Sequence, residues 1–403
     1  MKDTSLASMP SEPGAVAGEG VIPLCVPEIR GKEWDYIKEC LDTNWVSSVG
    51  PFVDRFERML AGRAGTAHAI AAVNGTSALH IALLVAGVQP DDEVLTSTLT
   101  FIAPANAIRY AGAWPVLVDA ERHYWQMDPQ RVVDFLDREC RWTSGALINN
   151  RTGRRVRAIV PVHILGHPVD VDPILEAARK YELAVIEDAT ESLGAVYKGR
   201  RVGGLGDIGC FSFNGNKIIT TGGGGMLCTN DAERAGRAKY LTTQAKDDPV
   251  EYVHGEVGYN YRLTNIQAAL GCAQMEQLDQ FIVAKRRLAA RYTEAFGGVP
   301  GITPMPEASW ANSIFWMYTI LVDEKLYGED SRALLRRLAQ RGIQARPLWQ
   351  PLHQSKVYEG AQVCGGEVAA ELNARALSLP CSVGLTEDSL GAVIEAVRES
   401  SVY

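Results

Sequence analysis

One lysine lies in a sequence setting unlike that of a surface lysine. Lys217 follows the apolar run Cys210–Phe213 across a short polar turn, and four glycines, Gly222–Gly225, come soon after it. Glycines let the backbone approach another group closely, and a lysine withdrawn from water has a lowered pKa and a nucleophilic amine. This setting favours imine (Schiff base) formation with an aldehyde. The alternative is a lysine that pairs with a carboxylate or extends its amine to solvent.

An acid and an aromatic residue lie at the ends of other apolar runs. Asp188 ends the run LAVIED, and Phe101 comes shortly after Glu93–Ser97. Ligands of α/β sheets bind beyond the carboxyl ends of the strands, so both residues are placed for ligand contact. A buried carboxylate needs a cation such as a protonated ring nitrogen, and an aromatic side chain can stack on a flat ring. The alternatives are a helix N-cap for Asp188 and a core position for Phe101.

A further segment has the composition of an anion site. Asn74, Gly75, Thr76 and Ser77 follow a strand-like run and open an apolar helix. The free N–H groups and positive end of a helix favour a bound phosphate. Ser212, five residues before the lysine, adds a hydroxyl. An ordinary N-cap formed by the threonine or the serine is the alternative.

These positions together describe a single ligand. A phosphate site, a stacking aromatic, an acid for a ring nitrogen and a lysine for an aldehyde match pyridoxal 5′-phosphate (PLP). A metal site is not predicted. His163 and His167 are spaced as metal ligands on a helix would be, but Pro161, Gly166 and Pro168 keep them off a regular helix, and no third ligand is evident.

The elements that must position these residues alternate along the chain. Short apolar runs alternate with helical patterns, which predicts an α/β domain with a largely parallel sheet and helices on both faces. The predicted strands are His68–Val73, Glu93–Ser97, Pro115–Asp119, Ala158–His163, Leu183–Asp188 and Asp207–Phe213. The predicted helices are Ser77–Ala86, Ala103–Tyr110, Pro129–Cys140 and Val171–Tyr181.

The pattern changes after residue 262, which predicts a second, smaller α+β domain. It contains one long helix, Asn265–Phe296, a strand Trp316–Val322, a helix Ser331–Gln340 and a last helix after Thr386. The predicted division is a disordered tail over 1–20, a large domain over 21–262 and a smaller domain over 263–403. A helix over Lys32–Asp42 is expected to pack through Trp34, Ile37 and Leu41.

Charge and composition exclude several classes of protein. The chain of 403 residues has 40 basic and 48 acidic residues, a net charge of −8, which argues against nucleic acid as the main partner. Its apolar runs are shorter than the roughly 18 residues of a membrane span. The eight cysteines form no CxxC pair, and the start of the chain lacks the pattern of a signal peptide. We therefore expect reduced, mostly buried thiols in a cytoplasmic protein.

Five segments together resemble the DegT/DnrJ/EryC1/StrS sugar aminotransferases, a family with the fold-type-I PLP architecture. They are NGTSALHIAL, TFIAPANAI, IEDATESLGA, GDIGCFSFNGNKIITTGGGG and GYNYRLTNIQAALG. The resemblance implies PLP as cofactor, L-glutamate as amino donor, a nucleotide-linked keto-sugar as acceptor, and a homodimer with shared active sites.

The resemblance also implies roles for single residues. Lys217 matches the imine-forming lysine, Asp188 the partner of the pyridine nitrogen, and Phe101 the stacking aromatic. Phosphate contacts are implied for Gly75, Thr76 and Ser212, and Asn260 matches an asparagine that reaches the phosphate in the neighbouring subunit. We add Ser77 from its place at the helix start. Glu191 stands where many members have His or Gln, and its carboxylate would repel the cofactor's phenolate oxygen unless protonated or turned away.

The motif IEDATESLGA, supported by CLDTNWVSSVG, is similar to a branch that aminates UDP-linked 4-keto-6-deoxy-N-acetylhexosamines. The alternatives are a 3-keto sugar, a TDP- or GDP-linked sugar, and a PLP-binding regulator without turnover. Family dehydratases replace the lysine with histidine, so Lys217 argues against that activity. The expected substrate contacts are Trp45, Ser48, His163, Tyr261, Arg262 and His353, the last with a surface histidine as its alternative.

Overall fold

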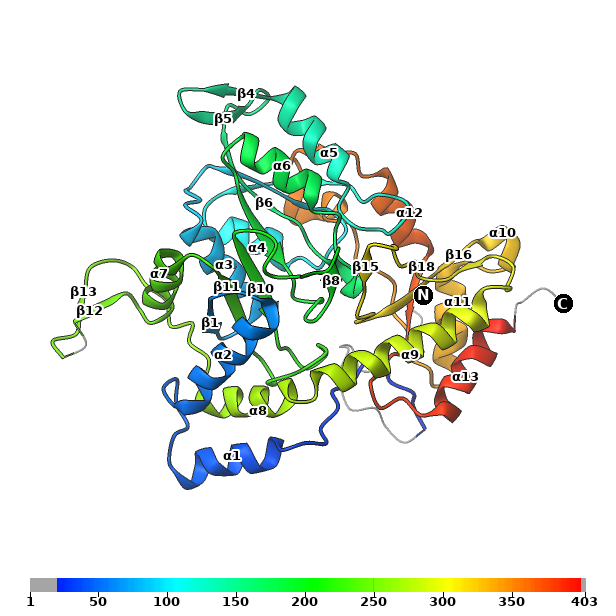
Figure 1. Ribbon diagram of the computed structural model, residues 1–403. Coiled ribbons are helices and arrows are strands. Elements are labelled where there is room, and N and C mark those ends of the chain that lie inside the picture. Colours follow the sequence, from blue (N-terminus) through cyan, green and yellow to red (C-terminus); the bar gives the residue numbers. More distant parts are fainter. Residues whose placement is uncertain (1–19, 249, 400–403) are drawn as a thin grey trace.

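A computed structural model describes residues 20–248 and 250–399, so the predicted tail lies outside the described residues except for Gly20. Its centre is a large sheet (Figure 1). The strand order is β1 (His68–Ala72), β11 (Gly225–Thr229), β10 (Ile208–Ser212), β7 (Ala184–Asp188), β6 (Arg155–Val160), β2 (Glu93–Ser97), β3 (Trp114–Val118) and β17 (Val363–Cys364). From β10 to β17 every pair is parallel, whereas β11 is antiparallel to both neighbours. The antiparallel hairpin of β4 (Cys140–Thr143) and β5 (Ala146–Asn149) extends from β6.

Helices cover both faces of this sheet, and each face has its own apolar core. On one face the core joins the sheet to α3 (Gly75–Val85), α4 (Ala103–Tyr110) and α7 (Ala232–Thr242). On the other face it includes α2 (Pro51–Ala64), α5 (Pro129–Asp134), α6 (Asp172–Lys180) and α8 (Asn265–Met275). The predicted α/β class, with a mostly parallel sheet flanked by helices, is confirmed.

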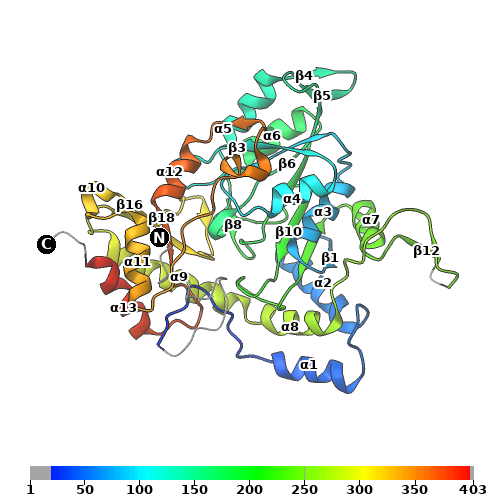
Figure 2. The same cartoon turned by 180° about the vertical axis from the view of Figure 1, so that it is seen from behind.

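A smaller α+β unit follows at the C-terminal end. Figures 1 and 2 show it beside the large sheet, joined to it by the long helix α9 (Leu278–Phe296). Its antiparallel sheet has the order β14 (Ile302–Thr303), β16 (Tyr318–Val322) and β18 (Ala376–Leu379). Its other helices are α10 (Glu324–Tyr327), α11 (Ser331–Gln340), α12 (Glu367–Arg375) and α13 (Glu387–Arg398). Small strands elsewhere are β8 (Val196–Tyr197), β9 (Arg200–Arg201), β15 (Ala311–Asn312), and the hairpin of β12 (Lys246–Asp248) and β13 (Val253–His254).

Two segments cross between these units. The Leu24 N–H donates to Gln344 Oε1 at 3.1 Å, and the Leu24 carbonyl accepts the Cys381 N–H at 2.8 Å, so the start of the described chain pairs with the C-terminal unit. In the opposite direction, β17 contributes an edge strand to the large sheet. The predicted boundary at residue 262 remains a prediction.

Two predicted helices differ from the structure, and a strand of the large sheet was not predicted. The helix predicted over Pro129–Cys140 ends at Asp134 and continues as a π-helical turn, Phe135–Glu139, before β4. The helix predicted over Asn265–Phe296 is two helices, interrupted where Glu276 binds Arg55 at 2.6 Å and the Gln277 side chain binds Glu33. Strand β11 was not predicted because it begins within the glycine run, and glycine is a weak strand former.

Helix α1 (Glu33–Asp42) packs through a different face from the one predicted. Trp34 and Leu41 are 74% and 54% exposed. The buried face instead uses Glu33, whose carboxylate accepts from Gln274 Nε2 at 2.6 Å, and Cys40, whose thiol contacts the Asn265 carbonyl. Specific polar contacts to α8 therefore decide the orientation, and an apolar surface remains exposed on α1.

One buried lysine lies outside the predicted site. Lys285 on α9 is 1% exposed, and its amine donates to the carbonyls of Trp316, at 2.8 Å, and Cys381. The sulfurs of Cys381 and Cys25 lie 3.5 and 3.8 Å from the same nitrogen. All eight cysteines are free, and all but the half-buried Cys364 are buried. Within residues 20–248 and 250–399, no helix has the length and apolar character that crossing a membrane requires.

Candidate active site

A cavity of about 560 Å³ around Lys217 is lined by residues from both the large sheet's unit and the C-terminal unit. Its wall contains many of the residues predicted from sequence and several that were not. The lining residues used below are Leu24, Gly75, Thr76, Phe101, Leu165, Thr190, Glu191, Ser212, Asn214, Asn216, Lys217, Trp316, Arg346, Trp349 and Ser378.

Lys217 enters this cavity from the turn that follows β10. The turn is closed by the Lys217 N–H, which donates to the Asn214 carbonyl at 3.0 Å. The amine lies 3.5 Å from Glu191 Oε1 and 4.0 Å from the centre of the Trp316 ring. The indole N–H donates to the Asn216 carbonyl at 2.8 Å, which fixes the ring beneath the lysine. The lysine therefore pairs with a carboxylate and also faces an open cavity, where a ligand can reach it.

Asp188 ends β7 and is 2% exposed. Its Oδ1 accepts the Thr190 N–H at 3.1 Å, and the segment after it consists of turns, so the helix N-cap alternative is wrong. Burial raises the pKa of Asp188. A protonated ring nitrogen bound beside this carboxylate would supply the positive charge that a buried acid needs.

The N-terminus of α3 fits a phosphate group. Asn74 is the N-cap, and its side chain accepts the Ser77 N–H at 2.8 Å, so neither predicted hydroxyl is the cap. The N–H groups of Gly75 and Thr76 have no acceptor within the helix, as in any first helical turn. A Cβ on Gly75 would lie 2.8 Å from Ser212 Cβ, too close for any larger residue. Ser77 itself is buried and does not line the cavity.

Phe101 is 56% exposed and lines the cavity, so its alternative interpretation as a core residue is wrong. An apolar ring is exposed here beside the lysine and the phosphate-type site, where a flat ligand would cover it. Together with Asp188 and the α3 N-terminus, these residues fit PLP.

Glu191 is the position where this chain departs from many members of the family it resembles. It is 6% exposed, and its Oε2 accepts the Leu165 N–H at 2.8 Å. Burial raises the pKa of Glu191 to about 7, while the nearby Lys217 opposes that rise. A carboxyl group with this pKa is readily protonated, so it can lie near an anionic oxygen of the cofactor without strong repulsion.

The other predicted site residues lie outside the cavity wall of this chain. His163 is fully buried: its Nδ1 accepts the Val169 N–H at 3.0 Å, and its Nε2 lies 3.1 Å from Glu187, so this geometry gives no support to a substrate contact. His353 is half-buried, with Nδ1 2.8 Å from Thr98 Oγ1. The remaining predicted site residues that do not line the cavity are Trp45, Ser48, Asn260, Tyr261 and Arg262.

Asn260 is exposed and lies next to the base of the β12–β13 hairpin, where it pairs with Thr243. Trp45 is 48% exposed and lies in the loop after α1.

Sequence reasoning missed several lining residues. Thr190 lies inside the motif IEDATES and could have been found from it. Trp316 and Ser378 belong to the antiparallel sheet of the C-terminal unit or its approach, and nothing local in the sequence places them near Lys217. Arg346 and Trp349 come shortly before His353 in the segment RPLWQPLH, of which only the histidine was predicted as a contact.

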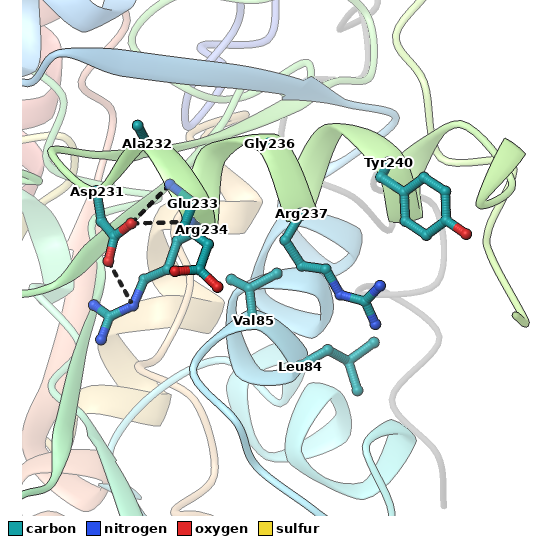
Figure 3. Close-up of a pocket in the computed structure, with 9 residues that line it drawn as sticks. All are labelled: Leu84, Val85, Asp231, Ala232, Glu233, Arg234, Gly236, Arg237 and Tyr240. Atoms are coloured by element: carbon teal, nitrogen blue, oxygen red, sulfur yellow. Dashed lines mark hydrogen bonds and ion pairs between the residues drawn. The ribbon is translucent and has the colours of Figure 1, made fainter. Parts of the chain in front are cut away.

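A second cavity, of about 710 Å³, lies between α3 and α7 (Figure 3). Both arginines in its wall already have partners. Arg234 binds Asp207 at 2.6 Å and also Asp231, and Arg237 binds Glu256. The cavity has no lysine and no buried acid comparable to those of the first one, and we assign it no chemistry.

The fold and the first cavity together define a PLP-dependent aminotransferase. The chain belongs to the DegT/DnrJ/EryC1/StrS aminotransferase family, whose model matches residues 27–398. It is therefore a PLP-dependent sugar aminotransferase, and the enzyme class and cofactor predicted from sequence are confirmed.

Similar proteins extend over nearly the whole chain. GDP-perosamine synthase of Caulobacter vibrioides is 41% identical over 379 residues, covering 94% of this chain and 98% of that one. EpsN of Bacillus subtilis, whose name describes it as a pyridoxal phosphate-dependent aminotransferase, is 40% identical over 380 residues, covering 93% of this chain and 95% of EpsN. The crystal structure of the aminotransferase TlmJ from Streptoalloteichus hindustanus has a TM-score of 0.84 at 27% identity, covering 94% and 98%. The predicted UDP-linked acceptor is not confirmed, since the sugar named for the first relative is GDP-linked.

Proposed function

We propose that this enzyme transfers the amino group of L-glutamate to the C4 keto carbon of a nucleotide-linked 4-keto-6-deoxyhexose. The observation that carries the proposal is the grouping of Lys217, Glu191 and the α3 N-terminus around one cavity, together with the buried carboxylate of Asp188 at the end of β7. This arrangement suits amino transfer, since it provides a nucleophile, a phosphate site and a buried acid for a ring nitrogen.

In this proposal each residue has a defined task. PLP, when bound, supplies an aldehyde for the amine and a ring that accepts electrons from the donor's Cα. Lys217 binds the cofactor and then, as a free amine, moves a proton between the donor's Cα and the cofactor's C4′. Asp188 holds the proton on the ring nitrogen. The N–H groups of Gly75 and Thr76, with the Ser212 hydroxyl, bind the phosphate, and Phe101 stacks on the ring.

A homodimer with shared sites completes the proposal. Apolar side chains on and after α1, namely Trp34, Leu41, Trp45, Val46 and Val49, are between 42% and 74% exposed. The β12–β13 hairpin projects from the body of the molecule (Figures 1 and 2) and also exposes apolar residues. Exposed apolar area of this kind supports an interface. In the dimer, Asn260 contacts the phosphate bound by the other subunit.

Two acceptors have specific support. The names of relatives at 41% and 38% identity favour a GDP-linked sugar, whereas the motif IEDATESLGA favours a UDP-linked N-acetylhexosamine. The choice of acceptor also includes the carbon that is aminated, which is C4 in this proposal and C3 in the alternative. A cytoplasmic location suits either substrate.

The test begins with the visible spectrum of the purified protein before and after L-glutamate is added. A yellow band that glutamate bleaches is expected, and it separates an enzyme from a regulator that only binds PLP. The bleached protein is then offered GDP-, UDP- and TDP-linked keto-sugars, and the return of the yellow band identifies the acceptor. A protein that binds no PLP, or whose band glutamate leaves unchanged, overturns the proposal.

A further inference from the structure

Two thiols meet beside a buried amine in the C-terminal unit. The sulfurs of Cys381 and Cys25 lie 3.5 and 3.8 Å from the Nζ of Lys285. All three residues are at most 3% exposed. Cys25 comes from the start of the described chain, Lys285 from α9 and Cys381 from the segment after β18. The activity proposed above uses none of these three groups.

The backbone brings the two thiols within bonding range of each other. The Leu24 carbonyl accepts the Cys381 N–H at 2.8 Å, and the Val26 N–H donates to the Ser382 hydroxyl at 3.0 Å. These two contacts hold the segment of Cys25 alongside the segment of Cys381. Hydrogen-bonded segments lie about 5 Å apart, which is within the range of Cα separations that disulfides span. Because both sulfurs also point to one nitrogen, side-chain rotation is enough to join them.

Charge makes one of the two thiols the reactive one. The hydrogen bond with Cys25 and the charge of Lys285 lower the pKa of Cys381 to about 6. The same hydrogen bond, together with burial, raises the pKa of Cys25. Cys381 is therefore anionic at neutral pH, and Cys25 keeps its proton. Since the thiolate is the nucleophile, Cys381 reacts first with an oxidant, and Cys25 is placed to resolve the product.

The pair lies directly behind the wall of the active-site cavity. The Cys25 sulfur is 3.5 Å from the Asn216 carbonyl oxygen, and the Cys381 sulfur is 3.4 Å from the Trp316 carbonyl oxygen. Asn216 and Trp316 both line the cavity. One layer of residues therefore separates the sulfurs from the cavity, and a small oxidant inside it needs only a local movement of that layer to reach them.

We propose that Cys25 and Cys381 form a reversible disulfide when a hydroperoxide enters the cavity. The Cys381 sulfur attacks one peroxide oxygen: an S–O bond forms, the O–O bond breaks, and the other oxygen leaves with a proton from the Lys285 ammonium. The Cys25 sulfur then attacks the sulfenic acid of Cys381. The S–S bond forms, the S–O bond breaks, and the hydroxyl leaves as water with the proton of Cys25. The two sulfurs lose two electrons, and the peroxide gains them.

The buried charges cancel both before and after this reaction. In the reduced protein the ammonium of Lys285 compensates the thiolate of Cys381. After the proton is transferred the amine is neutral, and it still has two hydrogens for the carbonyls of Trp316 and Cys381. The disulfide therefore leaves no uncompensated charge in the interior. Lys285 acts here as a proton donor and forms no bond of its own to oxygen or sulfur.

The test treats the reduced, PLP-loaded protein with hydrogen peroxide. The remaining thiols are blocked with N-ethylmaleimide, and linked peptides are mapped by mass spectrometry without reduction. A Cys25–Cys381 link that dithiothreitol removes is expected. Cys140 is the internal control, because it is 9% exposed, more than either thiol of the pair, while burial raises its pKa to about 12. The pair should oxidise at least about tenfold faster than Cys140.

Serine variants separate the roles of the two thiols. Cys25→Ser should stop at a sulfenic acid on Cys381, which dimedone labels, and Cys381→Ser should leave Cys25 reduced over the same time. The control variant Cys140→Ser should form the link at the wild-type rate. The inference is overturned if Cys140 is oxidised before the pair, if the link forms only in urea, or if Cys381 is instead joined to Lys285 through an oxygen. The wild-type map decides these points even if a variant folds poorly.

Discussion

Lys217 and Lys285 are both withdrawn from water, yet of these two lysines only Lys217 is placed for amino transfer. Lys217 has a side chain 13% exposed and faces a cavity, with one carboxylate oxygen at 3.5 Å and the face of a tryptophan ring as neighbours. Lys285 is closed inside the C-terminal unit, where two carbonyls and two thiols surround its amine. The carbonyls around Lys285 occupy its amine inside the protein, whereas the amine of Lys217 can be reached by a ligand that enters the cavity.

Trp316 connects the two sites. Its ring lies beneath the amine of Lys217, and its carbonyl accepts a hydrogen bond from Lys285. Burial of a lysine is therefore not by itself a sign of reactivity. The partners of the amine and its access to a cavity separate a reactive lysine from a structural one.

The largest effect is expected for Lys217→Ala. The amine is the only group in the proposal that both binds PLP and moves the proton, so turnover should fall by about a thousandfold or more. The melting temperature of the apoprotein should change little, since the amine faces a cavity. Full activity in this variant would remove the distinction between the two lysines.

Lys285→Met should produce the opposite pattern. The change keeps the apolar stem but leaves two buried carbonyls without a donor, which should lower the free energy of unfolding by about 2–4 kcal/mol. Urea unfolding measures this loss, and activity per folded molecule should change only a few-fold. Lys239→Met on α7 is the control, because that lysine is 53% exposed. A stable but inactive Lys285→Met protein would show that Lys285 takes part in the chemistry.

Glu191→Gln tests the acid that accompanies Lys217. The pKa of Glu191 is raised to about 7 from its ordinary 4.5, so the native apoprotein holds its proton where the unfolded chain has lost it. The stability from this group is complete below about pH 4.5 and is lost as the pH rises through 7, by up to about 3 kcal/mol. Because Gln resembles the protonated acid and does not titrate, urea unfolding at pH 5 and pH 8 should show the wild type losing stability relative to the variant at the higher pH. Parallel profiles would contradict the raised pKa.

The smallest effects are expected from the thiols around Lys285. A hydrogen bond with Cys25 and the charge of Lys285 hold the pKa of Cys381 at about 6, so Cys381 is the anionic partner. Cys381→Ser should therefore cost about 2 kcal/mol of stability, and Cys25→Ser less than about 1 kcal/mol. Equal losses, measured by urea unfolding, would mean that the two sulfurs share the charge.

The parts of the site that sequence reasoning predicted are those carried by short continuous segments. Lys217, Asp188, Thr76 and Phe101 each lie within a few residues of a strand end, and the strand places them. Gly75 was predicted from its place at the helix start and from the family resemblance, and the structure adds that a Cβ there would lie 2.8 Å from Ser212 Cβ. Alternation of strands and helices likewise predicted the α/β class, since that pattern repeats along the chain.

The rest depends on contacts between distant segments. Trp316 and Arg346 lie about 100 and 130 residues beyond Lys217, and no local pattern announces that they share its cavity. The buried face of helix α1 was predicted incorrectly, because apolar periodicity does not reveal the buried contact of Glu33 with Gln274. The break after α8 lies where Glu276 pairs with Arg55, a contact that is likewise non-local.

The pairing of Leu24 with Gln344 and Cys381 has a consequence for how the protein is made. Leu24 and Arg346 both line the cavity, although more than 300 residues separate them. Leu24 is synthesised long before Arg346. The nascent chain therefore cannot form the complete cavity until the segment that carries Arg346 has been made. Contacts between such distant segments slow folding. Cofactor capture should therefore wait until the segments that carry Arg346 and Ser378 have been made and have folded onto the rest of the wall.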